Sequence, residues 1–163
     1  MSPHTIRLRG PWEYRPLART VRLADGSTQV ESGELPAAGR LLLPADWGGT
    51  LGDGFRGRVA YLRRFGRPTG LTAADRVELV ITRVDAWASV RLNGRTLGEI
   101  PAGGLLGRYD ITRQLARRNE LVVEVELPRL TDRSLPLARP GRAGLPGGLV
   151  GEVRLEILTA DGG

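Results

Sequence analysis

The sequence predicts an all-β protein, an antiparallel β-sandwich, from three observations. Apolar and polar residues alternate with a period of two in short runs along the whole chain, which is the pattern of half-buried strands. Turn-forming residues separate these runs at intervals of roughly ten residues, as in all-β sandwiches. Helical periodicity is nearly absent, so the strands lack the intervening helices that a parallel sheet needs.

Six runs show the alternation most clearly, and each gathers its apolar residues on one face. They lie at residues 6–9, 58–65, 77–82, 88–92, 121–127 and 153–157. Two dipeptides, Asp25-Gly26 and Asn93-Gly94, stand between apolar segments and predict hairpins, because both tolerate the positive φ that a two-residue hairpin turn requires. One apolar and one polar face per strand is the pattern of two sheets that pack over a common core.

The rest of the chain predicts little regular structure. Residues 112–117 could form about one helical turn, with Asp110 or Thr112 as its N-cap. The segments 47–57 and 129–148 are predicted to be irregular, since the first is rich in glycine and the second contains three prolines. Irregular segments as long as 129–148 are uncommon in compact domains and are often functional. Residues 1–163 are expected to form a single domain.

Arg63 interrupts the apolar face of the run 58–65. An arginine in this position can spread its aliphatic stem over the sheet while its guanidinium group binds a carboxylate. We therefore expect Arg63 to pair with Asp85 or with another carboxylate.

Composition excludes several function classes. The chain has 24 basic residues, all arginine, against 18 acidic ones, and the net charge is +6. The arginines are scattered from end to end, so we expect no specific nucleic-acid partner. With no cysteine and one histidine, disulfides, cysteine-based metal sites, thiol nucleophiles and multi-histidine sites are excluded, and we expect no metal or cofactor.

Location is predicted from what the sequence lacks. It contains no apolar run of 18 residues, so we expect no membrane partner. The polar start of the chain does not resemble an export signal. Together with the absence of cysteine, it favours a cytoplasmic location.

Six groups of residues occur in a recognisable order. They are Gly10-Pro11-Trp12, Leu43-Pro44-Ala45-Asp46-Trp47, Tyr61-Leu62-Arg63-Arg64-Phe65 with Pro68, the segment 84–98 around Asn93-Gly94, the segment 109–125, and Gly147-Gly148-Leu149 with Val153-Arg154-Leu155. Together they resemble the N-terminal sugar-binding domain of the family 2 glycoside hydrolases, the group of β-galactosidases, β-glucuronidases and β-mannosidases. The resemblance covers about residues 6–157 and implies a jelly-roll sandwich of the galactose-binding-like type.

The same resemblance argues against catalysis by this chain. In the resembled enzymes two glutamates of a separate barrel domain cleave the glycosidic bond, and such a barrel takes at least about 200 residues. We therefore expect no catalytic residues and no enzyme activity, but a carbohydrate-associated module that binds a sugar or docks on a catalytic or scaffold protein. Two alternatives stay open: a structural or protein-interaction sandwich without a sugar site, and an arginine-rich surface that binds anionic polymers.

Three residues are candidates for ligand binding. Sugar sites combine aromatic platforms with oriented polar groups. Trp12 and Trp47 are expected in the core, whereas Trp87 opens a strand and is expected near the surface. The resemblance implies two further contacts: Asp132 stands where galactosidases carry an aspartate that reaches the active site, and Asp53 is the polar residue offered by the first loop, where they carry an asparagine.

Overall fold

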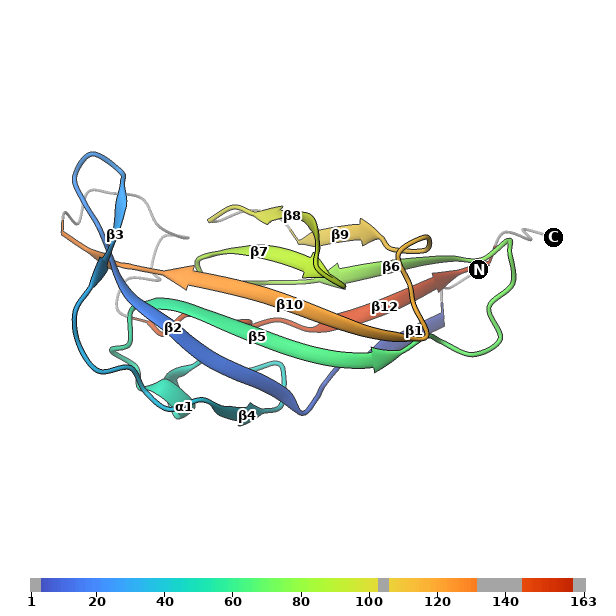
Figure 1. Ribbon diagram of the computed structural model, residues 1–163, viewed down its shortest axis with the longest axis horizontal. Coiled ribbons are helices and arrows are strands. Elements are labelled where there is room, and N and C mark those ends of the chain that lie inside the picture. The colour runs from blue at the N-terminus through green and yellow to red at the C-terminus, as the bar shows by residue number, and fades with distance from the viewer. Residues whose placement is uncertain (1–3, 103–105, 132–144, 160–163) are drawn as a thin grey trace.

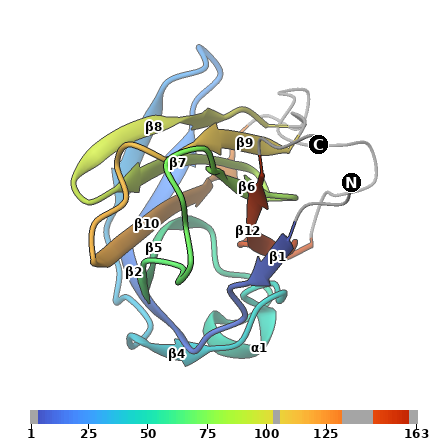
Figure 2. The ribbon, with the colours of Figure 1, turned by 90° about the vertical axis from the view of Figure 1, so that its right-hand side faces the viewer.

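The computed structural model describes residues 4–102, 106–131 and 145–159, and these residues form twelve strands and one short helix. The strands build two sheets that lie face to face along the long axis of the molecule (Figure 1) and form separate layers when viewed from the end (Figure 2). This arrangement confirms the predicted all-β sandwich.

The smaller sheet has four strands in the order β1-β12-β6-β9, and all of its pairs are antiparallel. They are β1 (His4–Arg7), β12 (Val153–Leu158), β6 (Arg76–Ile81) and β9 (Gly107–Asp110). The first and last described strands of the chain are thus neighbours, and the N-terminal strand closes the edge of this sheet.

The larger sheet has the order β11-β2-β5-β10-β7-β8, and β3 and β4 also pair with β2. Its strands are β2 (Trp12–Arg22), β3 (Thr28–Glu31), β4 (Gly39–Leu41), β5 (Gly57–Gly66), β7 (Trp87–Leu92), β8 (Arg95–Ile100), β10 (Arg118–Leu127) and β11 (Arg129–Leu130).

Strand β2 has different neighbours near its end. Arg19 pairs with β3 on one side and with Gly57 of β5 on the other, while Val21 pairs with β3 and with Arg129 of β11. The neighbour of β2 therefore changes along its length. As far as Gly57 the neighbour is β5, and beyond that residue it is β11, which continues the direction of β10.

The core fills the space between the sheets with the inward residues of both and with side chains from the connections. The largest fully buried side chains are Trp12, Trp47, Tyr61, Leu79, Ile81, Leu92, Ile111, Leu121, Leu149 and Leu155. Burial of each aliphatic or aromatic side chain of this size contributes about 1.5–3 kcal/mol to folding. Trp12 and Trp47 lie in the core, as the sequence predicted.

The turns agree with the sequence in one hairpin and differ in detail in the other. Leu92 pairs with Arg95, so Asn93 and Gly94 form a two-residue turn in which both have positive φ, 53° and 81°. The Asp25-Gly26 hairpin is also present, but its loop is longer, because Leu23 N–H donates to the Ser27 carbonyl and the Asp25 carboxylate accepts from Ser27 N–H.

Two segments predicted to be irregular contain regular structure. Helix α1 (Gly48–Leu51) is a single turn within 47–57, too short for periodicity to reveal. The first two residues of the segment 129–148 form β11, because β10 runs on beside β2, and Gly148 bridges Asp85 at its end. Residues 112–117 form turns and no helix, and the Asp110 carboxylate accepts the Thr112 backbone N–H as a cap would.

Candidate functional site

A groove of about 460 Å³ lies on the outer face of the larger sheet. The register places Arg58, Glu126 and Trp87 side by side on β5, β10 and β7, and Ser89 beside Glu124 in the next row. The alternation of each strand turns these side chains outward, since the residues between them point into the core. The groove is therefore a direct product of strand register.

Arg22 and Glu99 complete the groove from strands distant in sequence. Ala18 pairs with Arg58, so residues 18, 20 and 22 of β2 share its outward face, and Arg22 extends from the last position of β2. Glu99 lies on β8 directly opposite Ser89. The site thus spans the sheet from β2 to β8.

Most charges in the groove neutralise one another. The Arg58 Nε lies 3.7 Å from Glu124 Oε1 and 3.5 Å from Glu126 Oε2, and the Arg91 Nη2 lies 3.9 Å from Glu124 Oε2. Glu124 and Glu126 are therefore held by arginine on the outer face, as in an ordinary ion-paired strand surface. None of these three ion pairs resembles an isolated acid–base couple.

Arg22 differs from these paired groups. Its guanidinium carbon lies 5.4 Å from the centroid of the Trp87 ring, within the range of a cation–π contact, which contributes about 0.5–2 kcal/mol. Its Nε is buried and has no hydrogen-bond partner, and among the described residues the guanidinium forms no ion pair. Glu99 is exposed and likewise forms no ion pair within the described part of the chain. Within the described part of the chain, the groove therefore has one cation, Arg22, and one carboxylate, Glu99, that form no ion pair.

The sequence predicted three ligand residues: Trp87, Asp53 and Asp132. The structure places Trp87 in the groove and Asp53 outside it. Trp87 is half-buried and lines the groove. Asp53 is exposed in the turn after α1, where its carbonyl accepts from Arg56 Nη1 at 2.9 Å, and it does not line the groove. Asp132 lies outside the described residues. Sequence reasoning missed Arg22 and Glu99, since alternation marks them as outward but does not show which strands are neighbours.

Arg63 does not make the expected ion pair. Its Nη1 donates to the Arg64 carbonyl at 2.6 Å, and among the described residues it has no carboxylate partner. Asp85 lies near Arg83 instead, with 3.7 Å between Arg83 Nε and Asp85 Oδ2. The cause is register: Arg63 is level with Leu92 across β10, and Asp85 is seven residues before Leu92, about 23 Å along an extended chain.

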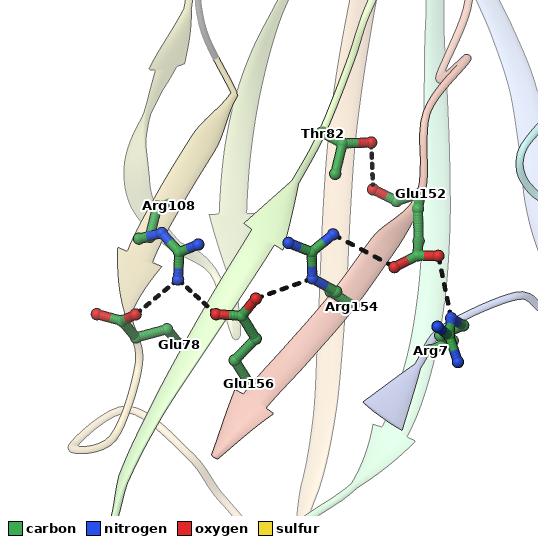
Figure 3. Close-up of polar contacts among 7 residues, drawn as sticks. All are labelled: Arg7, Glu78, Thr82, Arg108, Glu152, Arg154 and Glu156. Carbon is green, nitrogen blue, oxygen red and sulfur yellow. Dashed lines mark hydrogen bonds and ion pairs between the residues drawn. The ribbon is translucent and has the colours of Figure 1, made fainter. Parts of the chain in front are cut away.

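A second polar cluster covers the outer face of the smaller sheet (Figure 3). Glu156 stands directly opposite Glu78, an arrangement of like charges that destabilises a sheet unless it is compensated. Arg108 Nη1 compensates it by donating to both carboxylates, at 2.6 Å to Glu156 and 2.8 Å to Glu78. Arg154 Nε donates to the other oxygen of Glu156 at 3.0 Å.

This ladder continues to the edge of the sheet through Glu152, which accepts from Arg154 and from Arg7. The hydrogen bond from Arg108 is the main reason that the pKa of Glu156 lies below its ordinary value, and Arg154 lowers this pKa further, while burial opposes both. The hydrogen bonds to Glu156 and Glu78 raise the pKa of Arg108. Every carboxylate of the ladder is engaged within the sheet, so this face stabilises the fold and offers a ligand few free groups.

The described residues contain no group of three histidine, aspartate or glutamate side chains arranged to hold a metal ion. In the same residues no helix has the length and apolar character needed to cross a membrane, α1 being one turn long.

Comparison with known proteins identifies the fold. No protein-family model and no curated protein sequence matches the chain. Solved structures do match: an FMN-binding β-glucuronidase from Facaelibacterium prausnitzii L2-6 (TM-score 0.68, 24% identity, 97% of this chain and 23% of that one) and the Bifidobacterium dentium β-glucuronidase (0.69, 22%, 98% and 31%). The chain shares its fold with one part of these enzymes.

Further matches extend this likeness to other glycosidases. A rhamnosidase from Novosphingobium sp. PP1Y matches with a TM-score of 0.66 at 20% identity, over 97% of this chain and 15% of the rhamnosidase chain. This chain therefore spans less than a third of the length of each of the three enzymes. The resemblance that the sequence motifs indicated is confirmed at the level of the fold.

Proposed function

We propose that the chain is a non-catalytic carbohydrate-binding module and that the groove lined by Trp87 is its sugar site. The observation that carries this proposal is the composition of the groove: a half-buried indole beside one hydroxyl, unpaired polar groups and an ion-paired floor. Sugar rings bind through their apolar faces to aromatic side chains and through their hydroxyls to a few oriented polar groups. Ser89 and Glu99, opposite one another across β7 and β8, supply such groups.

The comparisons support the non-catalytic part of the proposal. The matched enzymes carry this fold in less than a third of their length, which leaves room for their catalytic machinery elsewhere. In this chain two carboxylates of the groove, Glu124 and Glu126, share Arg58. A glycosidase needs one carboxyl group that is protonated and one that is free to attack or to activate water.

Docking on another protein is the second candidate, and one observation favours it. The Arg22 guanidinium lies over the Trp87 ring and reduces the indole surface that a sugar could cover. Arginine and tryptophan in one shallow groove are also typical of protein interfaces.

A glycan array screened with the purified chain tests the two candidates. We expect retention of a defined class of oligosaccharide that persists at about 0.5 M salt, where non-specific attraction to the net positive chain is screened. Trp87→Ala should abolish this retention. Absence of any bound glycan for the folded wild-type chain would contradict sugar binding and would favour docking on a protein.

A further inference from the structure

We propose that the groove selects a sugar that carries a carboxylate, and that Arg22 binds this carboxylate. The inference rests on the proposed function and adds the substrate class. It starts from an unusual feature of the groove: among the described residues, Arg22 has an aromatic ring and no acid as its partner.

The contact with Trp87 holds the guanidinium carbon over the indole ring and uses no hydrogen-bond acceptor, so it leaves the N–H donors of the edge without a partner in the described residues. The edge carries the N–H donors, in a fork that matches the two oxygens of a carboxylate. Arg22 uses none of these donors toward other described residues, and its buried Nε has no acceptor. The two Nη groups are not among the buried atoms without a partner, so a carboxylate can reach them. A charged pair formed in such a partly buried place is screened less than one in open solvent.

The other cation of the groove cannot take this role. Arg58 lies between Glu124 and Glu126, so an incoming carboxylate would have to displace two acids of the protein. A neutral sugar offers Arg22 only hydroxyl and ring oxygens, which bind a guanidinium group less strongly than the two oxygens of a carboxylate. The guanidinium of Arg22 is therefore the group that distinguishes acidic from neutral ligands.

The distribution of charge also fixes the orientation of the ligand. Glu99 and Ser89 lie one row farther along the strands than Trp87, a step of about 7 Å. An unpaired carboxylate repels a second anion but accepts hydrogen bonds from sugar hydroxyls. The acid group of the sugar therefore points toward Arg22, and its hydroxyls point toward Ser89 and Glu99.

The test compares oligogalacturonate with the same oligosaccharide as its methyl ester, by calorimetric titration of the full chain. The two ligands differ in charge but keep the same ring hydroxyls. We expect esterification to weaken binding to the wild-type chain by tenfold or more, as for loss of a charged hydrogen bond. In Arg22→Gln the acid and the ester should bind alike, at the level that the ester reaches on the wild type.

Arg15→Gln is the matched control, because Arg15 is an exposed arginine of the same strand and among the described residues forms no ion pair. Both variants reduce the net charge from +6 to +5, so a difference between their affinities for the acid reports a specific contact of Arg22 and not the overall charge. Equal binding of acid and ester to the wild type, or equal effects of the two variants, would overturn the carboxylate assignment and leave sugar binding intact. Failure of every charged and neutral glycan to bind would instead contradict the proposed function.

Discussion

The guanidinium carbon of Arg22 lies 5.4 Å from the centroid of the Trp87 ring, although the two residues are 65 positions apart in the sequence. They meet because β5, which lies between β2 and β10, extends no farther than Gly57 on this side. Beyond Gly57, β11 continues β10 and pairs directly with β2. This local change of neighbours brings the last residue of β2 within reach of the first residue of β7.

Trp87 and Trp47 should respond differently to replacement by alanine. Trp47 is fully buried and packs edge-on against Phe55, so Trp47→Ala should lower the free energy of unfolding by about 3–5 kcal/mol. Trp87 is only half-buried, so Trp87→Ala should cost about 1–2 kcal/mol, including its contact with Arg22. Denaturant unfolding followed by circular dichroism measures both. An equal loss in the two variants would show that Trp87 is a core residue and not a surface one.

Arg108→Gln should destabilise the smaller sheet by about 1–2 kcal/mol at neutral pH, because Glu156 and Glu78 then face one another without their shared donor. Arg76→Gln is the control: Arg76 is exposed, and its ion pair among the described residues is a long one, 3.6 Å to Glu78, so its loss should cost less than about 0.5 kcal/mol. Chemical denaturation at pH 7 compares the two. Equal stability of both variants would contradict the bridging role of Arg108.

The lowered pKa of Glu156 predicts the direction of one pH effect. A carboxyl group whose pKa is lower in the folded state than in the unfolded one stabilises the fold above its unfolded pKa, about 4.3 for glutamate. This contribution is lost as the pH falls through the folded pKa. Arg108→Gln should raise the pKa of Glu156, which carbon-13 NMR titration of its carboxyl group would record. An unchanged pKa would show that Arg108 is not the main cause of the shift.

Gly57 should not tolerate a side chain. A Cβ at this position would lie within 3.0 Å of backbone atoms of Ala18 and Arg19, where β5 crosses the irregular register of β2. Gly57→Ala should therefore lower the free energy of unfolding by more than about 2 kcal/mol. Gly54→Ala is the control, since nothing lies within 4 Å of its Cβ and the change should be close to neutral. A neutral Gly57→Ala would contradict the close approach of these strands.

The Asn93-Gly94 turn separates backbone strain from hydrogen bonding. Gly94 has a φ of 81°, so Gly94→Ala should cost about 1 kcal/mol. Asn93→Gly keeps the positive φ but removes three bonds, from Nδ2 to the Gln114 carbonyl and the Asn119 side chain and from Glu120 N–H to Oδ1, and should cost about 1–3 kcal/mol. Thermal unfolding ranks the two. Stability of Asn93→Gly at the wild-type level would show that these bonds contribute nothing net.

Strand alternation predicted the sheets well because burial on one face leaves a period of two in the sequence. The strand β2 shows the limit of this signal: its polar residues and Pro16 hide a strand of eleven residues, with a register shift between Pro16 and Ala18. The helix α1 escaped prediction because four residues carry no period.

The site was predicted only in part, for a different reason. Trp87 could be placed near the surface from its position at the start of a strand, but Arg22 and Glu99 enter the groove through pairing between strands far apart in the chain. The order β2-β5-β10-β7-β8 follows from tertiary packing, and a single sequence holds no direct record of it. The expected ion pair between Arg63 and Asp85 was wrong for the same reason, because it depends on which strands are neighbours and in what register.

The most direct test of the central claim uses the three tryptophan indole N–H signals in a proton–nitrogen NMR spectrum, one for each of Trp12, Trp47 and Trp87. Titration with the glycan that the array selects should shift the Trp87 signal. The Trp12 indole, which donates to the Leu8 carbonyl inside the core, and the buried Trp47 indole should stay in place. Saturable binding that leaves the Trp87 signal unmoved would contradict the groove as the sugar site.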